Sequence, residues 1–258
     1  MDESLPMTFM SPSQGQATPV PTTAVSARTQ PWLVMSAAAI SWGVLAFVVL
    51  HLVSGRNPFQ DAVSFYAFTD QAPGLLSVSI LLVAIGSATT LAALNSAGIP
   101  LSRTTRVLFG CWSGGLALAA AFPVAYGELS SALSGEIHQY ACVAAFLSIP
   151  VLGFSLLKRT RGIPGLTRNH AALTRWTRYS VAGLALFGLS YLIAKVPAFS
   201  ELSTILPVGL TQRITLTVDI GLLYSTLHLA RRASTPVTEP FETAPEYADF
   251  AAEPTSVR

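Results

Sequence analysis

The chain has 258 residues, of which 51% are hydrophobic and only 11% are charged, and its formal net charge is +2. Soluble domains carry about 25% charged residues, so this chain has too little charge to cover a water-facing surface. The composition excludes an ordinary soluble domain and predicts an integral membrane protein. We expect no nucleic-acid partner and no cofactor, because the sequence has neither a phosphate loop nor a dinucleotide fingerprint.

The two ends of the chain differ in composition from its middle. Residues 1–30 are rich in Pro, Ser, Thr and Gln and lack the apolar core of a signal peptide. Residues 233–258 are Pro-rich and acidic. Neither segment has enough apolar surface to offset the entropy of ordering. We therefore expect two disordered cytoplasmic tails that flank a membrane domain of residues 31–232.

Six apolar segments of the middle region are each long enough to cross a bilayer as a helix, which takes about 20 residues. Turn-forming and charged residues separate them, and lipid does not tolerate exposed irregular backbone. The sequence therefore predicts an all-α fold, a six-transmembrane-helix bundle. The predicted spans are residues 32–53, 73–94, 107–126, 137–157, 176–196 and 205–230.

The basic residues fall almost entirely on one side of these spans. Twelve of the 15 lie in the two tails or at the second and fourth connections, whereas Arg56 and Lys195 lie on the other side and Arg213 lies within the last span. Cytoplasmic loops are enriched in Lys and Arg, so both ends of the chain should be cytoplasmic, in a plasma membrane. The basic fourth connection serves either as this topology signal or as a site for anionic lipid headgroups.

The cysteines and histidines do not form a metal motif. Cys111 and Cys142 stand alone and the four histidines are scattered, so we expect no metal site. The predicted spans place the two thiols about 15 Å apart in depth, which excludes a disulfide. His51, at the end of the first span, is expected at the membrane interface.

The last span carries Arg213 and Asp219 within apolar sequence. A charged side chain at the bilayer centre costs about 2.5–3.5 kcal/mol, so each one requires a partner inside the bundle. Their spacing turns them about 120° apart on a helix, and they are therefore not a pair with each other.

The outer connections supply acidic partners for Arg213, whose side chain is long enough to extend toward the interface. We expect Arg213 to meet Glu128, Glu136 and His138, with Asp61 as a further candidate. Such a cluster is able to bind a headgroup, move a proton or perform acid–base chemistry. The structural alternatives are that Glu136 complements the positive end of its helix and that Arg213 and one carboxylate join two helices.

Asp219 belongs to a polar stripe. Thr211, Thr215 and Asp219 recur every four residues, so they share one helix face, which should contact protein or water rather than lipid. The stripe is either an ion or proton path or a buried structural feature.

Four motifs, in this order, give the chain a family resemblance. They are "SFYAF" at residues 64–68, "AAAFPVAYGE" and "GEIHQYACVAAFLSIPV" within residues 119–151, and "GLTQRI" at residues 209–214. The chain resembles the bacterial integral-membrane family catalogued as domain of unknown function 998, common in actinobacteria, over roughly residues 32–232. The resemblance implies six spans, and within the quoted segments it maps the family pattern G-x-x-H onto Gly135 and His138 and the pattern G-L-x-[EQ]-R onto Gly209, Leu210, Gln212 and Arg213.

One motif departs from the family pattern. The family has F-P-x-D, and the position of that Asp holds Ala125 here, with Glu128 three residues later. If the family's Asp partners the His or the Arg, then Glu128 replaces it or the site is impaired. No activity is established for the family, so the resemblance supports the fold and the cluster but supplies no function.

Three kinds of function remain open. The first is a protein that binds an amphiphilic or lipid ligand at the outward-facing cluster, with membrane lipids as partners. The second is a small proton- or ion-coupled transporter that uses the polar stripe. The third is an intramembrane lipid-modifying enzyme, for which the sequence has no recognisable catalytic set. The sequence names no protein partner.

Overall fold

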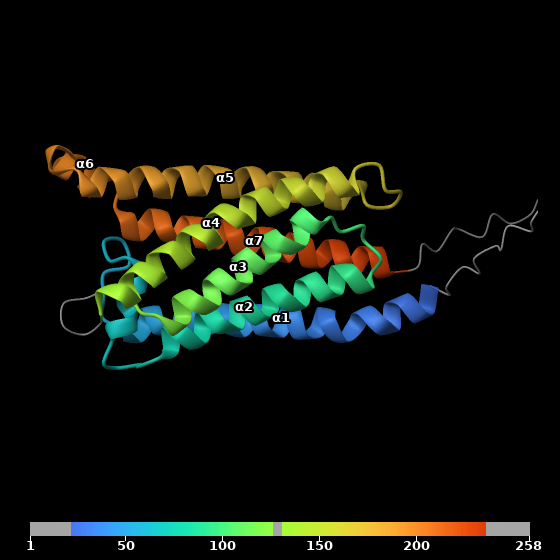
Figure 1. Ribbon diagram of the computed structural model, residues 1–258, viewed down its shortest axis with the longest axis horizontal. Helices are drawn as coiled ribbons and strands as arrows, with labels where there is room; N and C mark the ends of the chain where they lie inside the picture. The colour runs from blue at the N-terminus through green and yellow to red at the C-terminus, as the bar shows by residue number, and fades with distance from the viewer. Residues whose placement is uncertain (1–21, 126–130, 236–258) are drawn as a thin grey trace, which may run out of the picture.

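The computed structural model describes residues 22–125 and 131–235, and these residues form helices and connections without a strand (Figure 1). Three short helices lie in the connections: η1 (Val63–Phe68), η3 (Pro197–Phe199) and α6 (Ser200–Ile205). The long helices of the described residues are α1 (Thr22–Val53), α2 (Leu75–Ser96), α3 (Arg103–Ala121), α4 (Ala132–Thr160), α5 (Thr167–Lys195) and α7 (Val208–Ser234).

The long helices pack as a bundle in which α7 has a central place. Consecutive helices from α1 to α5 pack on one another, and α7 contacts α1, α2, α4 and α5. Because protein surrounds α7 on several sides, its buried polar residues Thr211, Thr215 and Asp219 face protein rather than lipid. This position explains how the helix that carries Arg213 and Asp219 is accommodated.

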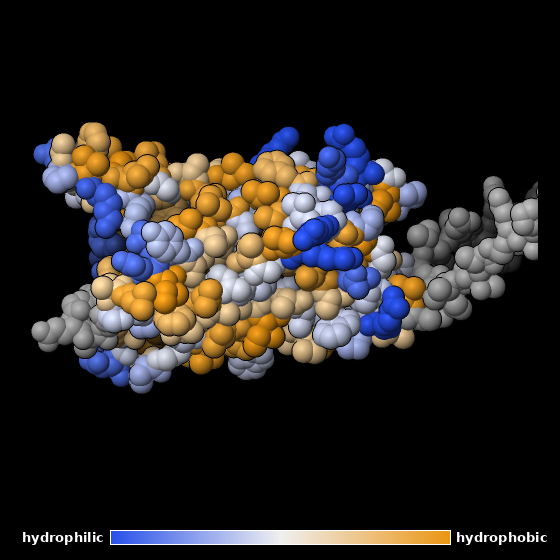
Figure 2. Space-filling model, in the orientation of Figure 1, coloured by the Kyte–Doolittle hydropathy of each residue, from blue (hydrophilic) through white to orange (hydrophobic). Residues whose placement is uncertain are grey.

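Four of the long helices are long and apolar enough to cross a membrane: Val25–Val53, Leu75–Ser96, Ala132–Thr160 and Thr167–Lys195. Charged side chains lower the mean hydropathy of the other two, since α3 begins with Arg103 and Arg106 and α7 contains Arg213 and Asp219. Hydrophobic residues cover much of the visible outer surface between the ends of the bundle (Figure 2). The fold is therefore that of a membrane-embedded protein.

The first helix begins earlier than the sequence predicts. The predicted disordered tail of residues 1–30 overlaps α1 over residues 22–30, and the rest of that tail lies outside the described residues. Pro31 lies inside α1 and removes one backbone hydrogen bond from the helix. Arg28 joins this part of α1 to α2, because its guanidinium donates to the Ser96 carbonyl (3.3 Å) at the C-terminal end of α2, where a cation is favoured.

The third helix ends sooner than predicted. α3 stops at Ala121, and Pro123 follows its C-terminal cap, Phe122. A proline after the cap cannot continue a helix, so the chain turns there instead of extending to residue 126. Residues 126–130 and the predicted tail beyond residue 235 lie outside the described part of the chain.

The bundle has two ends of different character. At the tail end, α1 begins, α7 ends, and the α2–α3 and α4–α5 connections lie nearby (Figure 1). Hydrophilic side chains gather there in Figure 2. At the loop end, α1 ends and α7 begins, and the connections contain η1, η3 and α6. The basic residues of the described tail end are Arg28, Arg103, Arg106, Lys158, Arg159, Arg161, Arg168, Arg175, Arg178, Arg231 and Arg232.

Candidate functional site

The connection between α1 and α2, here named the cap segment (residues 54–74), covers part of the loop end. Its short helix η1 buries Val63 and Tyr66, which are 6% and 1% exposed. These side chains pack with Leu50 of α1 and Leu76 of α2 in a small apolar cluster. Burial of these side chains fixes the cap segment to the bundle.

The first turns of α7 hold the cap segment by its backbone. The Leu210 N–H donates to the Phe59 carbonyl (2.9 Å). A Cβ on Gly209 would lie 2.6 Å from the carbonyl oxygens of both Phe59 and Asp61. A side chain at residue 209 would therefore push the cap segment away, and glycine is required by this close approach.

Arg213 extends the same attachment through four hydrogen bonds. Its Nε donates to His51 Nε2 (2.7 Å), and its Nη2 donates to the Tyr66 hydroxyl (2.8 Å). Its Nη1 donates to the carbonyl oxygens of Asp61 (2.8 Å) and Gly209 (2.7 Å). The guanidinium carbon also lies 5.2 Å from the centre of the Tyr66 ring, a cation–π contact. The planar guanidinium thus joins α1, the cap segment and α7.

His51 accepts from Arg213 as a neutral imidazole. Its Nδ1 lies 2.9 Å from the Phe47 carbonyl, and because a carbonyl only accepts, Nδ1 carries the ring proton. Nε2 is then free to accept the Arg213 Nε–H. His51 is therefore a specific partner inside the protein and not only the interfacial residue that the sequence predicts.

The other residues expected around Arg213 have different contacts. The Asp61 carboxylate accepts the Asn57 N–H (3.1 Å), so only its backbone carbonyl meets Arg213. Glu136 is exposed and lines a separate surface hollow between α3 and α4. Glu128 lies outside the described residues. The hydrogen bonds described for Arg213 thus link it to His51, and His138 belongs to a different arrangement.

His138 attaches the start of α4 to the end of α3. Its Nδ1 lies 3.0 Å from the Ala119 carbonyl and 2.9 Å from the Phe122 carbonyl. Both oxygens are acceptors, so Nδ1 carries a proton that they share, and two carbonyls left unpaired at the end of α3 gain a donor. Gly135 permits this approach, because a Cβ there would lie 2.8 Å from the Ala125 nitrogen.

The opposite nitrogen of His138 faces a thiol. Cys142 follows one turn later on α4, and its Sγ lies 3.5 Å from His138 Nε2. Since Nδ1 holds the proton of the neutral ring, Nε2 accepts from the thiol. The sequence predictions for Cys142 include no partner for its thiol. The signal that points to this pair is the i, i+4 spacing of the two residues.

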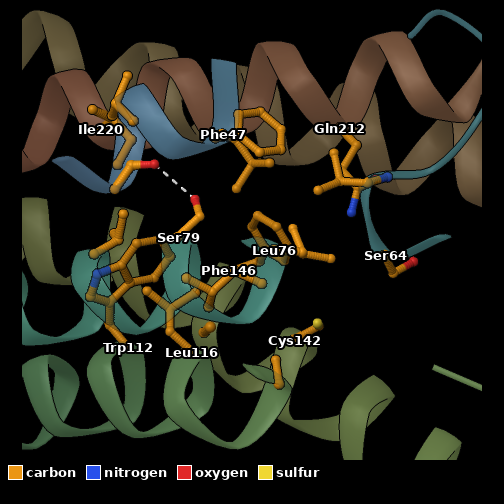
Figure 3. A pocket seen from close by; sticks show the side chains of 18 of the residues that line it. Phe47, Ser64, Leu76, Ser79, Trp112, Leu116, Cys142, Phe146, Gln212 and Ile220 are labelled. Atoms are coloured by element: carbon orange, nitrogen blue, oxygen red, sulfur yellow. Dashed lines mark hydrogen bonds between the residues drawn. The ribbon is translucent and has the colours of Figure 1, made fainter. Parts of the chain in front are cut away.

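A cavity of about 110 Å³ lies inside the loop-end half of the bundle (Figure 3). Its walls are mainly apolar and come from α1, α2, α3, α4 and α7, with Phe47, Leu76, Trp112, Leu116 and Phe146 among the lining residues. This volume is of the same order as the apolar cavity of about 150 Å³ that binds benzene in an engineered protein. The cavity is therefore large enough for part of a hydrocarbon chain.

Five polar side chains interrupt the apolar walls: Ser64, Ser79, His138, Cys142 and Gln212. Figure 3 places Gln212 and Cys142 on opposite sides of the cavity. Gln212 Oε1 accepts the Val63 N–H (2.8 Å), so the Gln212 amide hydrogens remain as donors. The Ser79 hydroxyl donates to the Gly43 carbonyl (2.8 Å). An apolar cavity with a few polar groups is typical of a site for a small molecule.

The polar stripe of α7 contacts α5. Thr211, Thr215 and Asp219 are each at most 1% exposed, and none of them lines the cavity or the surface hollow described above. Asp219 Oδ2 has no hydrogen-bond partner in the described part of the chain. The contacts to α5 are Thr211 Oγ1 with Ser190 Oγ (2.6 Å), Thr215 Oγ1 to the Gly183 carbonyl (2.8 Å) and Ser180 Oγ to Asp219 Oδ1 (2.5 Å).

These features define the class of protein: a helical membrane-embedded protein with a covered apolar cavity at one end of its bundle. A family model described as "Protein of unknown function (DUF998)" matches residues 37–227, which is most of the chain. The chain belongs to this family, as its motifs predict. Comparisons with curated proteins and with solved structures give no match.

Proposed function

We propose that this protein binds an amphiphilic membrane molecule, with the hydrocarbon part of the ligand in the loop-end cavity and its polar part at His138 and Gln212. One observation carries the proposal: a mostly apolar cavity contains a small set of donors and acceptors on facing walls. Apolar walls favour a hydrocarbon chain, because its burial removes apolar surface from water. The polar groups favour a ligand with a hydrogen-bonding head.

The arrangement in the membrane is part of the same proposal. All six long helices cross a plasma membrane, and the basic tail end faces the cytoplasm, in agreement with the positive-inside rule. The loop end and its cavity then lie on the external side. The ligand enters from the outer leaflet, and the cap segment covers it from the aqueous side.

Arg213 has a supporting part in this proposal. Its hydrogen bonds hold the cap segment and η1, and η1 supplies the lining residues Val63 and Ser64. Within the family motif at residues 209–213, Gly209 and Arg213 thus support the cavity rather than binding the ligand directly. We place His138 and Gln212 in the binding set and Arg213 in the set that positions the cap segment.

Photo-cross-linking tests the proposal. The purified chain in detergent micelles is irradiated with a fatty acid that carries a diazirine on its chain, and the modified residues are mapped by mass spectrometry. We expect labelling at Trp112, which is 1% exposed, and we expect an excess of unlabelled oleic acid to reduce it. Trp42, which is 63% exposed on α1, serves as the control for non-specific contact. Labelling of Trp42 without Trp112 would contradict the proposal.

A further inference from the structure

The pair of Cys142 and His138 has the geometry of a nucleophile with its base. The Cys142 Sγ lies 3.5 Å from His138 Nε2, and both residues line the cavity. His138 is 8% exposed, so water has little access to the imidazole. Its tautomer is fixed, because Nδ1 donates to the carbonyls of Ala119 and Phe122. An activated nucleophile is generally recognised by a thiol or hydroxyl that is hydrogen-bonded to a base, where a third group orients the base.

We propose that Cys142 accepts a long-chain acyl group and that His138 acts as the general base of this transfer. The inference rests on the proposed function, because part of the acyl chain would occupy the same cavity. The acyl donor is a long-chain ester or thioester, such as a phospholipid of the membrane or a soluble acyl thioester. The product is a thioester on Cys142, which makes the protein an acyl carrier or the acyl-enzyme of a transferase.

The transfer is balanced in atoms and needs no oxidant or reductant. The Cys142 sulfur attacks the carbonyl carbon of the donor, and the thiol proton passes to His138 Nε2. When the tetrahedral intermediate collapses, the bond between the carbonyl carbon and the leaving oxygen or sulfur breaks. The leaving alcohol or thiol takes the proton from His138, and the acyl group remains on Cys142.

The surroundings of the pair suit this chemistry. Apolar walls disfavour a free thiolate, so the proton passes to His138 as the new bond forms. The same walls keep water away from the thioester and slow its hydrolysis. Gln212, on the facing wall, has amide hydrogens to donate because its Oε1 is held by the Val63 N–H. In the proposed transfer, these hydrogens would donate to the carbonyl oxygen as it gains negative charge.

The second cysteine provides an internal comparison. Cys111 is exposed on α3 and lines the surface hollow rather than the cavity. Simple accessibility would favour reaction at Cys111, whereas the pairing with His138 favours reaction at Cys142. Faster acylation of Cys142 than of Cys111 would therefore distinguish reaction in the cavity from non-specific modification of an accessible thiol.

The test incubates the purified full-length chain with palmitoyl-coenzyme A in one arm and with phosphatidylglycerol vesicles in the other. Intact mass, peptide mapping and release by hydroxylamine report the acylated residue. We expect one acyl group on Cys142 in at least one arm, at least tenfold more than on Cys111, and none at residue 142 in Cys142→Ser. Cys111→Ser should leave the rate unchanged. The arm that reacts identifies the source of the acyl group.

The base is tested by His138→Asn. An Asn amide retains a donor near the position of Nδ1 and so preserves the contact with α3, but it lacks a basic nitrogen. We expect acylation to slow on the order of 10²-fold in the folded variant, the usual contribution of a general base. Rescue of the rate by raising the pH in His138→Asn would further support the role of the imidazole.

Three results would overturn the inference: no acylation of Cys142 in either arm, acylation of Cys111 at an equal rate, or full activity in a folded His138→Asn variant. The photo-cross-linking result tells the two proposals apart. Labelling of Trp112 without acylation would reject the transfer and keep the binding function. Loss of both would reject the binding function as well.

Discussion

Arg213 is stabilised by acceptors that carry no formal charge. The four hydrogen bonds described for it end on an imidazole nitrogen, a phenol oxygen and two carbonyl oxygens. Hydrogen bonds to a charged group contribute about 1.5–3 kcal/mol each, so several of them offset the cost of placing a guanidinium in the bundle. The fork of donors on the guanidinium is what allows one side chain to reach all four acceptors.

The fixed arrangement of the guanidinium donors gives the first prediction. Arg213→Lys keeps the charge but cannot reach His51, Tyr66 and the Asp61 carbonyl together. We expect the free energy of unfolding to fall by about 2–3 kcal/mol, measured by denaturation in detergent micelles. Arg106→Lys, at an exposed position on α3, is the control and should change it by less than about 0.5 kcal/mol. Equal stability of the two variants would contradict the role of Arg213.

The second prediction concerns the close approach at Gly209. Gly209→Ala places a methyl group 2.6 Å from two carbonyl oxygens of the cap segment. We expect a loss of about 1–3 kcal/mol, as for overpacking, and faster proteolysis within the cap segment. Gly110→Ala on α3 meets open space and should be neutral or stabilising by up to about 1 kcal/mol, because alanine is the better helix former. Gly209→Ala should therefore lower the free energy of unfolding, and Gly110→Ala should not.

At the scale of the helices, α7 is held to α5 through hydroxyl groups. Thr211, Thr215 and Asp219 are buried at this interface, and each has a partner on α5. Hydrogen bonds between membrane helices contribute about 0.6 kcal/mol on average, so the stripe supplies both stability and helix register. The stripe thus has a structural role in the described contacts, and an ion path through it stays a prediction.

The third prediction tests whether Asp219 stabilises the interface between α5 and α7 by its hydrogen bond or by its charge. Asp219→Asn keeps an oxygen that accepts from the Ser180 hydroxyl, so we expect the free energy of unfolding to change by less than about 1 kcal/mol. Asp219→Ala leaves the buried Ser180 hydroxyl without this partner and should cost about 1–3 kcal/mol. Thr217→Ala, at an exposed position of the same helix, controls for helix propensity. A severe loss in Asp219→Asn would point to a charge-dependent role instead.

For the molecule as a whole, apolar segment length predicts the helices well. The predicted segments correspond to the six long helices described here, and four of those helices have the length and apolarity to cross a membrane. The start of α1 could not be predicted in the same way, because polar composition and Pro31 argue against a helix there. The hydrogen bond from Arg28 to the Ser96 carbonyl joins this part of α1 to α2. A local sequence pattern does not predict a contact between residues so far apart in the chain.

The candidate site was harder to predict than the fold. Composition indicates that Arg213 needs a partner, but the partner depends on how α1 and α7 are rotated against each other. The choice of His51 over His138 is therefore set by packing. By contrast, the pairing of His138 with Cys142 follows from local helix geometry and was readable from the spacing of the two residues.

The fourth prediction tests the orientation of the whole bundle. Asp70→Cys in the cap segment and Arg161→Cys in the α4–α5 connection place single thiols at exposed positions of the two ends, in a background with Cys111→Ser and Cys142→Ser. We expect a membrane-impermeant maleimide to label residue 70 on intact cells and residue 161 only after permeabilisation. Labelling in the reverse order would place the cavity on the cytoplasmic side.

The most direct test of the binding function is to fill the cavity and count the lipid that remains bound. Leu216→Trp adds bulk at a residue that lines the cavity, and Ile214→Trp adds the same bulk at an exposed position of α7 outside the lining. Native mass spectrometry of the purified variants measures the fraction of chains that carry an amphiphilic molecule. We predict at least a tenfold loss of bound ligand in Leu216→Trp and wild-type occupancy in Ile214→Trp. Equal occupancy in two folded variants would contradict binding in this cavity.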